Sequence, residues 1–348
     1  LVFSIGFGFS PTFAIALSMR LCMGLFNGLT GVAKAAIPEI VPKGPEQQTA
    51  MGYVAGMWNA GMVFGPAAGG VLAERGGGLF RRYPYAPPNI FAAGLALLAL
   101  CVIEAWLPGK SSYARVAEAD TDEDKEEPAP PRRACARVPR TSWLPIGVYC
   151  FLSTFSIFYE DCYPLWLLTP RREGGMGFEV DEIGAVLSAT AVFTVAYQFL
   201  IFPFISERCP SHVLFPTSAG ISAVLMPVAV LIARMKPGAA TTWAALIFHN
   251  IVYRCAVSNA YTACFCTINN SCETGARGAV NGFAMSVASA FKAVGPSLGA
   301  SLYAYGLDRA PNGGVGVLAV FGGVGAALGV TALVACKYMG AEYDTPLD

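Results

Sequence analysis

The stretch GYVAGMWNAGMVFGPAAGG, residues 52–70, places glycines and a proline at fixed spacing inside an apolar segment. Its pattern, G-x8-G-x3-G-P-x2-G-G, consists of Gly52, Gly61, Gly65, Pro66, Gly69 and Gly70. Residues 282–300, GFAMSVASAFKAVGPSLGA, repeat the register 230 positions later, with four of the six positions identical. Close helix packing alone explains small residues at i, i+4 and i+8, but not a recurring Gly-Pro pair. The fixed offset predicts a duplicated helix bundle, an architecture typical of secondary transporters.

The composition is that of a membrane protein. Apolar residues make up 55% of the chain and charged residues 13%, against about a quarter charged in soluble domains. The net charge is zero and no long basic run is present, so we expect no nucleic-acid partner. The eleven cysteines form no CxxC pair, which argues against a disulfide framework or zinc ribbon. Cys264, Cys266 and Cys272 are expected to fill apolar space, and we expect no metal site and no cofactor.

Apolar stretches near or above 20 residues are long enough to cross a bilayer as helices. We expect nine such spans, at residues 11–37, 46–72, 88–107, 142–169, 179–206, 211–233, 241–268, 277–306 and 313–339. Residues 1–9 resemble the tail of another span. Because the chain starts at Leu1, inside apolar sequence and without an initiator Met, we expect it to be N-terminally incomplete.

One long hydrophilic segment, residues 108–141, divides the chain. It carries seven acidic residues, seven basic ones and several prolines, a composition that predicts a disordered linker. Residues 1–107 are then the remainder of an N-terminal bundle, and residues 142–348 form a C-terminal bundle of six helices. If each half has six, about two to three helices are missing at the N-terminus. The predicted fold class is all-α, a polytopic membrane helix bundle.

Lys and Arg in alternate loops predict the orientation. Twelve lie on the side that holds the linker and the C-terminus, and eight lie on the other side. We therefore expect the linker and the C-terminus in the cytosol, in either the vacuolar or the plasma membrane, and a monomeric protein.

The arrangement of spans, central linker and repeated glycine motif resembles the major facilitator superfamily. The fold of that family has six plus six helices built from inverted repeats and a cytosolic middle loop. The helix-five glycine motif is typical of its proton-coupled antiporters, and Arg20-x3-Gly24 resembles its intramembrane arginine motif. The closer resemblance is to plant-type zinc-induced-facilitator-like transporters, which are similar to drug:proton antiporters. It rests on Phe26-Asn27-Gly28-Leu29 with Lys34 and Glu39, YEDCYPLW at 159–166, Gly174-Gly175, Asn269-Asn270-Ser271, RGAVNG at 277–282 and FKAVGP at 291–296.

This resemblance implies secondary active transport by alternating access, with protons as coupling ions. It allows metal chelates, inorganic ions, organic anions or small drugs as substrates. The chain departs from the family at Glu160-Asp161, where the family usually has one carboxylate, at the position of Asp161. The family's W-G-x3-D-x2-G-R loop would lie in the missing N-terminal part.

Polar residues inside spans are costly unless they face a cavity or a partner. In the first span Arg20, Asn27 and Lys34 share one helix face with Gly24 and Gly31, which suits the wall of a water-filled path; a structural arginine paired with carbonyls is the alternative. Asn250, Arg254, Ser258 and Tyr261 form a similar stripe. For His249 a hydrogen bond within the bundle is expected in preference to a metal.

Glu160 and Asp161 lie about 18 residues into their span. Burial raises the pKa of a carboxyl group and a nearby arginine lowers it, so such a group can load and release a proton. We hypothesise that Asp161 couples proton movement to transport, with Arg20 or Arg254 tuning it; an interfacial position before Pro164 is the alternative. Lys292, just before Gly295-Pro296, is a further candidate for the solute pathway, by facing a cavity or pairing with an acid.

Pro66 and Pro296 bend their helices, and the glycines around them, Gly299 included, let helices approach and slide. We interpret both motifs as hinge and packing surfaces. The sequence has two histidines and neither H-E-x-x-H nor G-x-S-x-G, so an enzyme is not expected. A transport-inactive receptor or scaffold with the same fold is the alternative to a transporter.

Overall fold

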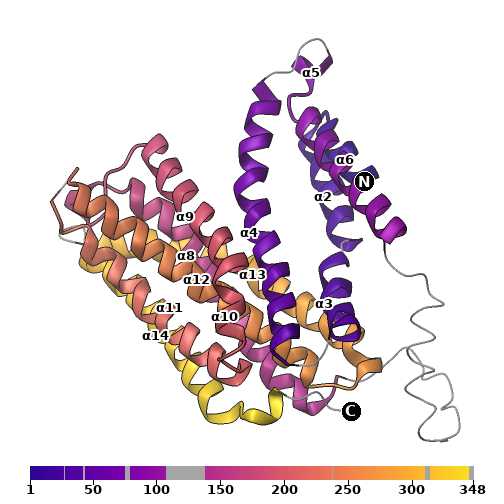
Figure 1. The fold of residues 1–348 in the computed structure, drawn as a ribbon. Coiled ribbons are helices and arrows are strands. Elements are labelled where there is room, and N and C mark those ends of the chain that lie inside the picture. Colours follow the sequence, from indigo (N-terminus) through magenta and orange to yellow (C-terminus); the bar gives the residue numbers. More distant parts are fainter. Residues whose placement is uncertain are drawn as a thin grey trace, which may run out of the picture. The chain divides into compact units, whose positions relative to one another are not determined.

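The computed structural model describes residues 1–26, 28–41, 44–74, 79–106, 138–236, 238–309 and 314–344. Every element assigned within these ranges is a helix (Figure 1). The longer ones are α1 (Val2–Gly8), α2 (Phe13–Leu25), α3 (Leu29–Ile40), α4 (Pro45–Glu74), α6 (Ala86–Trp106), α8 (Trp143–Leu168), α9 (Val180–Leu200), α11 (Ser211–Ile232), α12 (Ala240–Asn270), α13 (Arg277–Arg309) and α14 (Val315–Tyr338). Two short helices are α5 (Leu79–Arg82) and α10 (Phe202–Ser206).

The span expected at residues 11–37 is the one that differs most from its prediction. Helix α2 ends at Leu25 and α3 begins at Leu29. The sequence between them contains Asn27-Gly28, two residues with low helix propensity because Asn competes for backbone hydrogen bonds and Gly costs backbone entropy. At the start of α2, Thr12 caps the helix by accepting a hydrogen bond from the Ile15 amide at 3.4 Å.

The contacts divide the chain into two compact units. The small unit comprises Leu1–Gly28 and Phe64–Ala136, and the large unit Leu29–Val63 and Arg137–Asp348. In the small unit α1 packs against α2 and α6, and Ser4 Oγ donates to Asn89 Oδ1 at 3.3 Å. The large unit includes α3 and the first part of α4, which sequence reasoning assigned to the N-terminal bundle. The division into bundles at 1–107 and 142–348 therefore stays a prediction.

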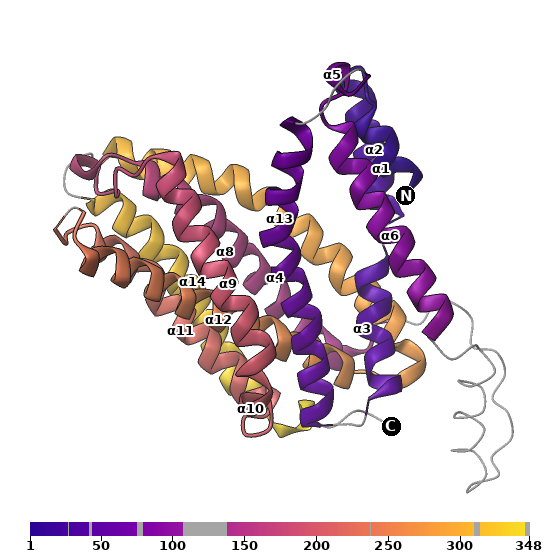
Figure 2. The ribbon, with the colours of Figure 1, turned by 45° about the horizontal axis from the view of Figure 1, so that its top comes forward.

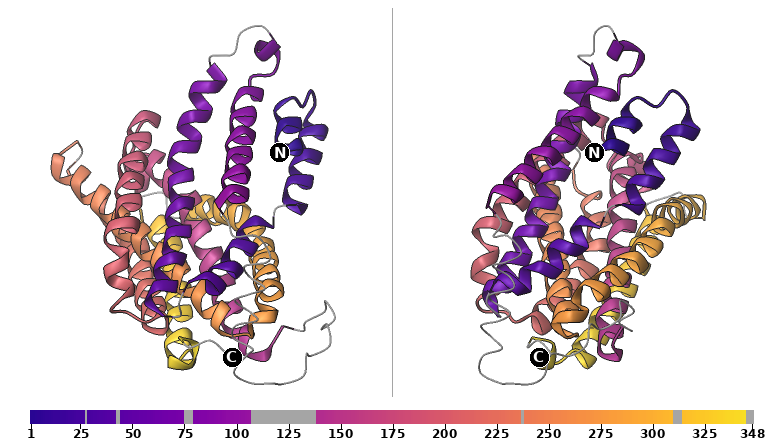
Figure 3. Two further views of the ribbon diagram at one scale, coloured as in Figure 1. Left: turned by 45° about the vertical axis from the view of Figure 1, so that its right-hand side comes forward. Right: turned by 90° about the vertical axis from the view of Figure 1, so that its right-hand side faces the viewer.

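In the large unit α11 packs against α14 and α12, α13 packs against α8, and α9 packs against α12. Figure 2 shows α11 and α14 side by side, and the same pairing can be followed by colour in Figure 3. Helix α3 packs against α13. This arrangement brings polar side chains of α3, α8, α12 and α13 into one neighbourhood.

Alternate connections of the large unit meet at opposite ends of its helices. At one end the hydroxyls of Thr141 and Ser142 donate to the Ser271 carbonyl at 2.7 and 3.1 Å. At the other end the Arg171 guanidinium donates to the carbonyls of Ala233 and Met235 at 3.1 and 3.0 Å. Helices α8, α9, α11 and α12 therefore run back and forth between two loop layers, as transmembrane helices do.

Helix α9 has a polar buried face and an apolar outer face. Its buried residues are Val186, Thr190, Thr194 and Gln198, one residue per turn. On the outside, Phe193 is 58% exposed and Leu200 is 68% exposed. This is the reverse of a water-soluble amphipathic helix. It is the pattern of a helix that faces lipid on one side.

By length and composition, five continuous helical segments of the described chain can cross a membrane: Ala86–Ala105, Arg140–Leu168, Val180–Leu200, Ser211–Ile232 and Val315–Tyr338. A sixth candidate, Phe13–Pro38, takes in α2 and most of α3 together with residue 27, which is outside the described residues. The other three expected spans correspond to α4, α12 and α13, which are 30, 31 and 33 residues long. They are long enough to span, but they are richer in Asn, Ser, Thr and Gly, and α12 buries polar side chains along most of its length.

Candidate solute and proton site

Two lysines lie on a group of three aromatic rings in the large unit. The rings of Tyr149 (α8), Tyr261 and Phe265 (both α12) have centroids 5.6 to 6.1 Å apart. Lys34 Nζ, from α3, lies 3.2 Å from the Phe265 centroid and 5.8 Å from that of Tyr149. Lys292 Nζ, from α13, lies 5.5 Å from the Tyr261 centroid. We call these five residues the lysine–aromatic cluster.

A carboxylate and an arginine lie beside the lysine–aromatic cluster. Glu160 (α8) is half-buried and within electrostatic range of both Arg254 (α12) and Lys292. Among the described residues no ion pair within 4 Å involves any of the three. Glu160 therefore interacts with two cations at a distance, an arrangement in which a change of charge nearby is felt by the carboxyl group.

Three tyrosine hydroxyls close to Arg254 have no hydrogen-bond partner in the described part of the chain. Tyr159, Tyr163 and Tyr253 are each at most 2% exposed, and their hydroxyl groups are unpaired. The Tyr159 ring lies 4.4 Å from that of Tyr253 and 5.5 Å from that of Tyr163, between centroids. A buried hydroxyl without a partner costs about 1–3 kcal/mol, so these groups are candidates for binding water or a ligand.

Asp161 is placed differently from its neighbour. Its side chain is exposed on the large unit, whereas that of Glu160 is half-buried. Consecutive residues of an α-helix point about 100° apart, so only one of the two can face α12 and α13. In this structure that residue is Glu160, although the sequence comparison with the family favoured Asp161.

The stripe predicted on α12 divides between two neighbouring helices. Asn250 is buried and donates to Thr190 Oγ1 of α9 at 3.2 Å, and Ser258 donates to Gln198 Oε1 at 2.7 Å. Tyr261 hydrogen-bonds Ser156 of α8 at 2.7 Å. Asn250 is thus hydrogen-bonded inside the large unit, its place in a solute pathway stays a prediction, and Arg254 is the stripe member whose positive charge acts on Glu160.

His249 makes a hydrogen bond within the bundle, as expected, with its Nε2 2.8 Å from the Leu225 carbonyl oxygen. Within the described ranges no group of three or more His, Cys, Asp or Glu side chains is placed to hold a metal ion. Cys272, just beyond α12, is buried, and burial raises the pKa of its thiol to about 11. It is therefore protonated at neutral pH and fills space.

Arg20 belongs to the small unit. Its guanidinium carbon lies 4.4 Å from the centroid of the Phe7 ring, and it borders a hollow of about 500 Å³ together with residues of α1, α2 and α6. The group around Glu160 belongs to the other, large unit, so a role of Arg20 beside it stays a prediction. Asn27, the other predicted pathway residue of this stripe, lies outside the described residues.

The two copies of the glycine motif have different surroundings. A Cβ atom at Gly295 would lie 2.6 Å from Ile157 Cγ2, and one at Gly299 would lie 3.3 Å from Phe158 and 3.4 Å from Cys162. These two glycines therefore let α13 approach α8. In the first copy, Gly52 meets the side chains of Phe202 and Gln198 in the same way.

The remaining glycines of the first copy are open. No atom of its own unit lies within 4 Å of a Cβ placed at Gly61, Gly65 or Gly69. Pro66 and Gly70 lie within α4, but they are not among the residues whose surroundings the structure describes. In the second copy, Pro296 lies inside α13. The hinge and packing role of the first copy stays a prediction.

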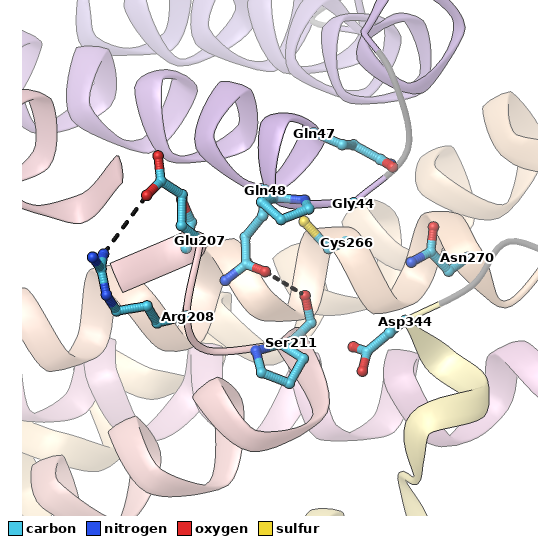
Figure 4. A pocket seen from close by; sticks show the side chains of 12 residues that line it. Gly44, Gln47, Gln48, Glu207, Arg208, Ser211, Cys266, Asn270 and Asp344 are labelled. Atoms are coloured by element: carbon cyan, nitrogen blue, oxygen red, sulfur yellow. Dashed lines mark hydrogen bonds and ion pairs between the residues drawn. The ribbon is translucent and has the colours of Figure 1, made fainter. Parts of the chain in front are cut away.

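A second hollow, of about 210 Å³, opens where α4 and α11 begin (Figure 4). Figure 4 shows Gln48 and Ser211 pointing toward each other, and Ser211 Oγ donates to Gln48 Oε1 at 3.2 Å. The Gln48 amide also donates to the Cys209 carbonyl at 3.2 Å, and Thr49 hydrogen-bonds Ser206 at 2.5 Å. Asp344 borders the hollow and hydrogen-bonds the His212 imidazole and backbone amide. These bonds attach the start of α4 to α10 and α11.

Sequence reasoning placed Lys34 on a polar stripe with Arg20 but did not connect it to Lys292. The aromatic partners Tyr149 and Phe265 were missed altogether, because in an apolar span an aromatic residue gives no separate signal. The lysine–aromatic cluster is assembled from four helices, so only the packing shows it.

Residues 1–300 match the family model of the Major Facilitator Superfamily. The chain belongs to this superfamily of membrane transporters and is a multi-pass membrane protein, which confirms the predicted all-α polytopic fold. Protein ZINC INDUCED FACILITATOR-LIKE 1 of Arabidopsis thaliana is 26% identical, over 88% of this chain and 68% of the relative. The Major facilitator superfamily multidrug transporter mfsB of Aspergillus fumigatus is 23% identical, over 87% and 64%.

Among solved structures, the human organic anion transporter MFSD10 (TETRAN) has a TM-score of 0.64 at 17% identity, covering 96% of this chain and 74% of that one. A likeness at this level of identity establishes the fold that the two chains share.

Proposed function

We propose that this protein is a secondary active transporter that exchanges a small solute for protons by alternating access. The observation that carries the proposal is Glu160, a half-buried carboxylate inside a span that faces Arg254 and Lys292 without a direct ion pair. A carboxyl group in such surroundings binds or releases its proton when the neighbouring charge changes. Arrival or departure of a solute is such a change, so the two fluxes become linked.

The hydrogen bonds at the start of α4 support the alternating-access part of the proposal. Gln48 and Thr49 bond residues of the α10–α11 region, and Asn59 donates to Ser258 of α12 at 3.5 Å. These contacts involve side chains, so they can break and re-form without unfolding a helix. We propose that these bonds keep one end of the solute path closed while they are formed, and that they break to open it once in each transport cycle.

Flux measurements on Glu160 and Asp161 variants test the coupling. In proteoliposomes with an imposed pH gradient, a panel of labelled organic anions, metal chelates, inorganic ions and small drugs identifies a transported solute. Glu160→Gln should abolish the gradient dependence of that flux and leave gradient-free counterflow intact, because only the proton site is lost. Glu104→Gln, an exposed carboxylate at the end of α6, is the matched control.

Asp161→Asn separates the two adjacent carboxylates. It should retain gradient-driven flux if Glu160 is the coupling group. The reverse result, with Glu160→Gln fully coupled and Asp161→Asn uncoupled, would return the role to Asp161. If no solute of the panel moves in response to a pH gradient, proton-coupled antiport is refuted and the transport-inactive receptor is favoured.

A further inference from the structure

The two amines of the lysine–aromatic cluster have no acidic partner in contact among the described side chains. Lys34 is 4% exposed and Lys292 is half-buried. Neither makes an ion pair within 4 Å with any described residue. Lys34 lies over the faces of Phe265 and Tyr149, and Lys292 lies over the face of Tyr261. A cation over an aromatic face gains far less free energy than an ammonium group loses when it leaves water.

The local charge is unbalanced as well. Lys34 and Lys292 are close enough to repel each other, and Arg254 adds a third positive charge within range of Glu160. Among the described carboxylates Glu160 is the one that faces this group, since Asp161 is exposed and does not act on either lysine. Among the described residues, three basic side chains against one carboxylate leave a formal net positive charge at a site that is largely removed from solvent.

We propose that the lysine–aromatic cluster binds the acidic group of an organic anion with a flat apolar body, such as an aromatic carboxylate or sulfonate. The anionic oxygens lie between the Lys34 and Lys292 ammonium groups and replace their mutual repulsion by attraction. The apolar body packs against Tyr149, Tyr261 and Phe265, which offer ring faces and edges in a mutually tilted arrangement. The inference rests on the proposed function, because it names the class of solute that the transporter carries.

The arrangement also explains why the amines would be kept in so costly a place. If each lysine formed an ion pair with a carboxylate of the protein, the site without a ligand would be more stable. Such a site would have no net charge to attract a ligand. Two amines that lie over aromatic rings are available for a ligand, and the neighbouring Glu160 gives the bound anion an influence on the proton site. Anion binding and proton release then occur on adjacent groups of the large unit.

Thermal stabilisation by matched probes tests the inference without requiring transport. The full chain in phosphatidylcholine nanodiscs is melted with two pairs that differ in the sign of charge: benzoate against benzylammonium, and fluorescein against rhodamine 123. A ligand that binds the folded state raises the melting temperature. Benzoate or fluorescein should stabilise the protein and its cationic counterpart should not. Equal or greater stabilisation by the cations, or none by either anion, would overturn the inference.

Substitutions of the lysines locate the effect. Lys34→Gln or Lys292→Gln should raise the dissociation constant of the stabilising anion about ten-fold or more, since a hydrogen bond to a charged group is worth about 1.5–3 kcal/mol. Lys34→Arg and Lys292→Arg keep the charge and should retain most of the binding. Lys337→Gln, an exposed lysine 5.0 Å from the Tyr338 ring, is the control. Unchanged anion affinity in both Gln variants, each folded as judged by its own melting transition, would refute the site.

A second arm distinguishes a soluble anion from an anionic lipid. Nanodiscs that contain phosphatidylglycerol supply a phosphate headgroup with the same charge. If this lipid alone stabilises the protein and both Gln variants lose the effect, the cluster is a lipid site and the inference fails. Anion binding in phosphatidylcholine without any gradient-driven flux would support this inference and refute the proposed transport.

Discussion

Gly299 shows how one hydrogen atom in place of a side chain sets the distance between two helices. The Cβ of any larger residue there would meet Phe158 and Cys162 of α8 at 3.3 and 3.4 Å. Those contacts are already tight, and a branched side chain would extend beyond them. The helix α13 therefore approaches α8 only because positions 295 and 299, one turn apart, carry no side chain.

We expect Gly299→Leu to lower the free energy of unfolding by about 1–3 kcal/mol, the usual cost of forcing extra methylenes into a packed interface. The melting temperature of the purified protein in detergent measures it. Gly65→Leu is the comparison, because no atom of its own unit lies within 4 Å of that Cβ position, and its melting temperature should match that of the wild type. Equal loss in both variants would show that the packing difference has no energetic meaning.

Substitutions in the first copy of the glycine motif distinguish stability from movement. From the sequence motif we expect Gly65→Leu or Gly69→Leu to stop transport while the protein remains in the membrane, because a large side chain prevents helices from sliding past one another. Uptake into proteoliposomes at equal protein content is the measurement. Normal uptake by both variants would show that the first glycine motif is not needed for the transport cycle.

At the scale of elements, α9 and α12 are joined by hydrogen bonds that repeat every eight residues. Asn250 bonds Thr190 and Ser258 bonds Gln198; next to the second pair, Asn259 donates to the Tyr197 hydroxyl at 2.7 Å. In lipid these bonds have no competition from water, yet measured side-chain bonds between membrane helices average about 0.6 kcal/mol, with a maximum near 1.7. The ladder therefore contributes a moderate amount at several points along the interface.

Thr190→Val removes the acceptor of Asn250 at nearly constant volume. It should lower the free energy of unfolding by about 0.6–1.7 kcal/mol, measured by denaturation in mixed micelles. Val192→Ala, two residues along the same helix and 58% exposed, should change it far less. A loss at residue 192 as large as that at residue 190 would contradict the assignment of the polar face to the interior.

The start of α4 gives a second prediction at this scale. The double substitution Gln48→Leu with Thr49→Val removes the side-chain bonds to Cys209, Ser211 and Ser206. Hydrogen–deuterium exchange in residues 45–63 and 201–211 should then become faster, because this end of α4 separates more often. Met57→Ala, 64% exposed, serves as the control. Unchanged exchange in the double variant would mean that these bonds do not hold α4 in place.

Sequence patterns located these helices well because span length depends on local composition. The expected span at 142–169 corresponds to α8, Trp143–Leu168, and that at 211–233 to α11, Ser211–Ile232. The choice between Glu160 and Asp161 could not be made from the sequence, because it depends on which neighbours pack on each face of α8. The pairing of Lys34 with Lys292 joins residues 258 positions apart, and no local pattern carries that information.

At the scale of the whole molecule, the two loop layers of the large unit make the predicted orientation testable. The excess of Lys and Arg on one side comes from residues 108–141, which carry seven of them; the segment lies mostly outside the described residues. We propose that the layer holding Thr141, Ser271 and Tyr343 faces the cytosol.

An epitope inserted at Gly275 should be reached by antibody when only the plasma membrane is permeabilised, and one inserted at Lys236 should not if the protein lies in the vacuolar membrane. If the protein lies in the plasma membrane, the tag at Lys236 should be reached in intact cells. For a vacuolar protein, labelling of both tags, or of neither, after permeabilisation of the plasma membrane alone would contradict the assignment of the two layers to opposite sides. For a plasma-membrane protein, labelling of both tags, or of the Gly275 tag alone, in intact cells would contradict it.

The reversed polarity of α9 also has a practical meaning for protein engineering. Its interior contacts come from Val186, Thr190, Thr194 and Gln198, while Val192, Phe193 and Leu200 take no part in them. The residues that specify packing and those that match the surrounding solvent are thus separate sets on this helix. Replacing only the outward set by Glu, Lys and Gln would adapt α9 to water without altering its fit to α12, which makes it a starting point for a soluble analogue of the large unit.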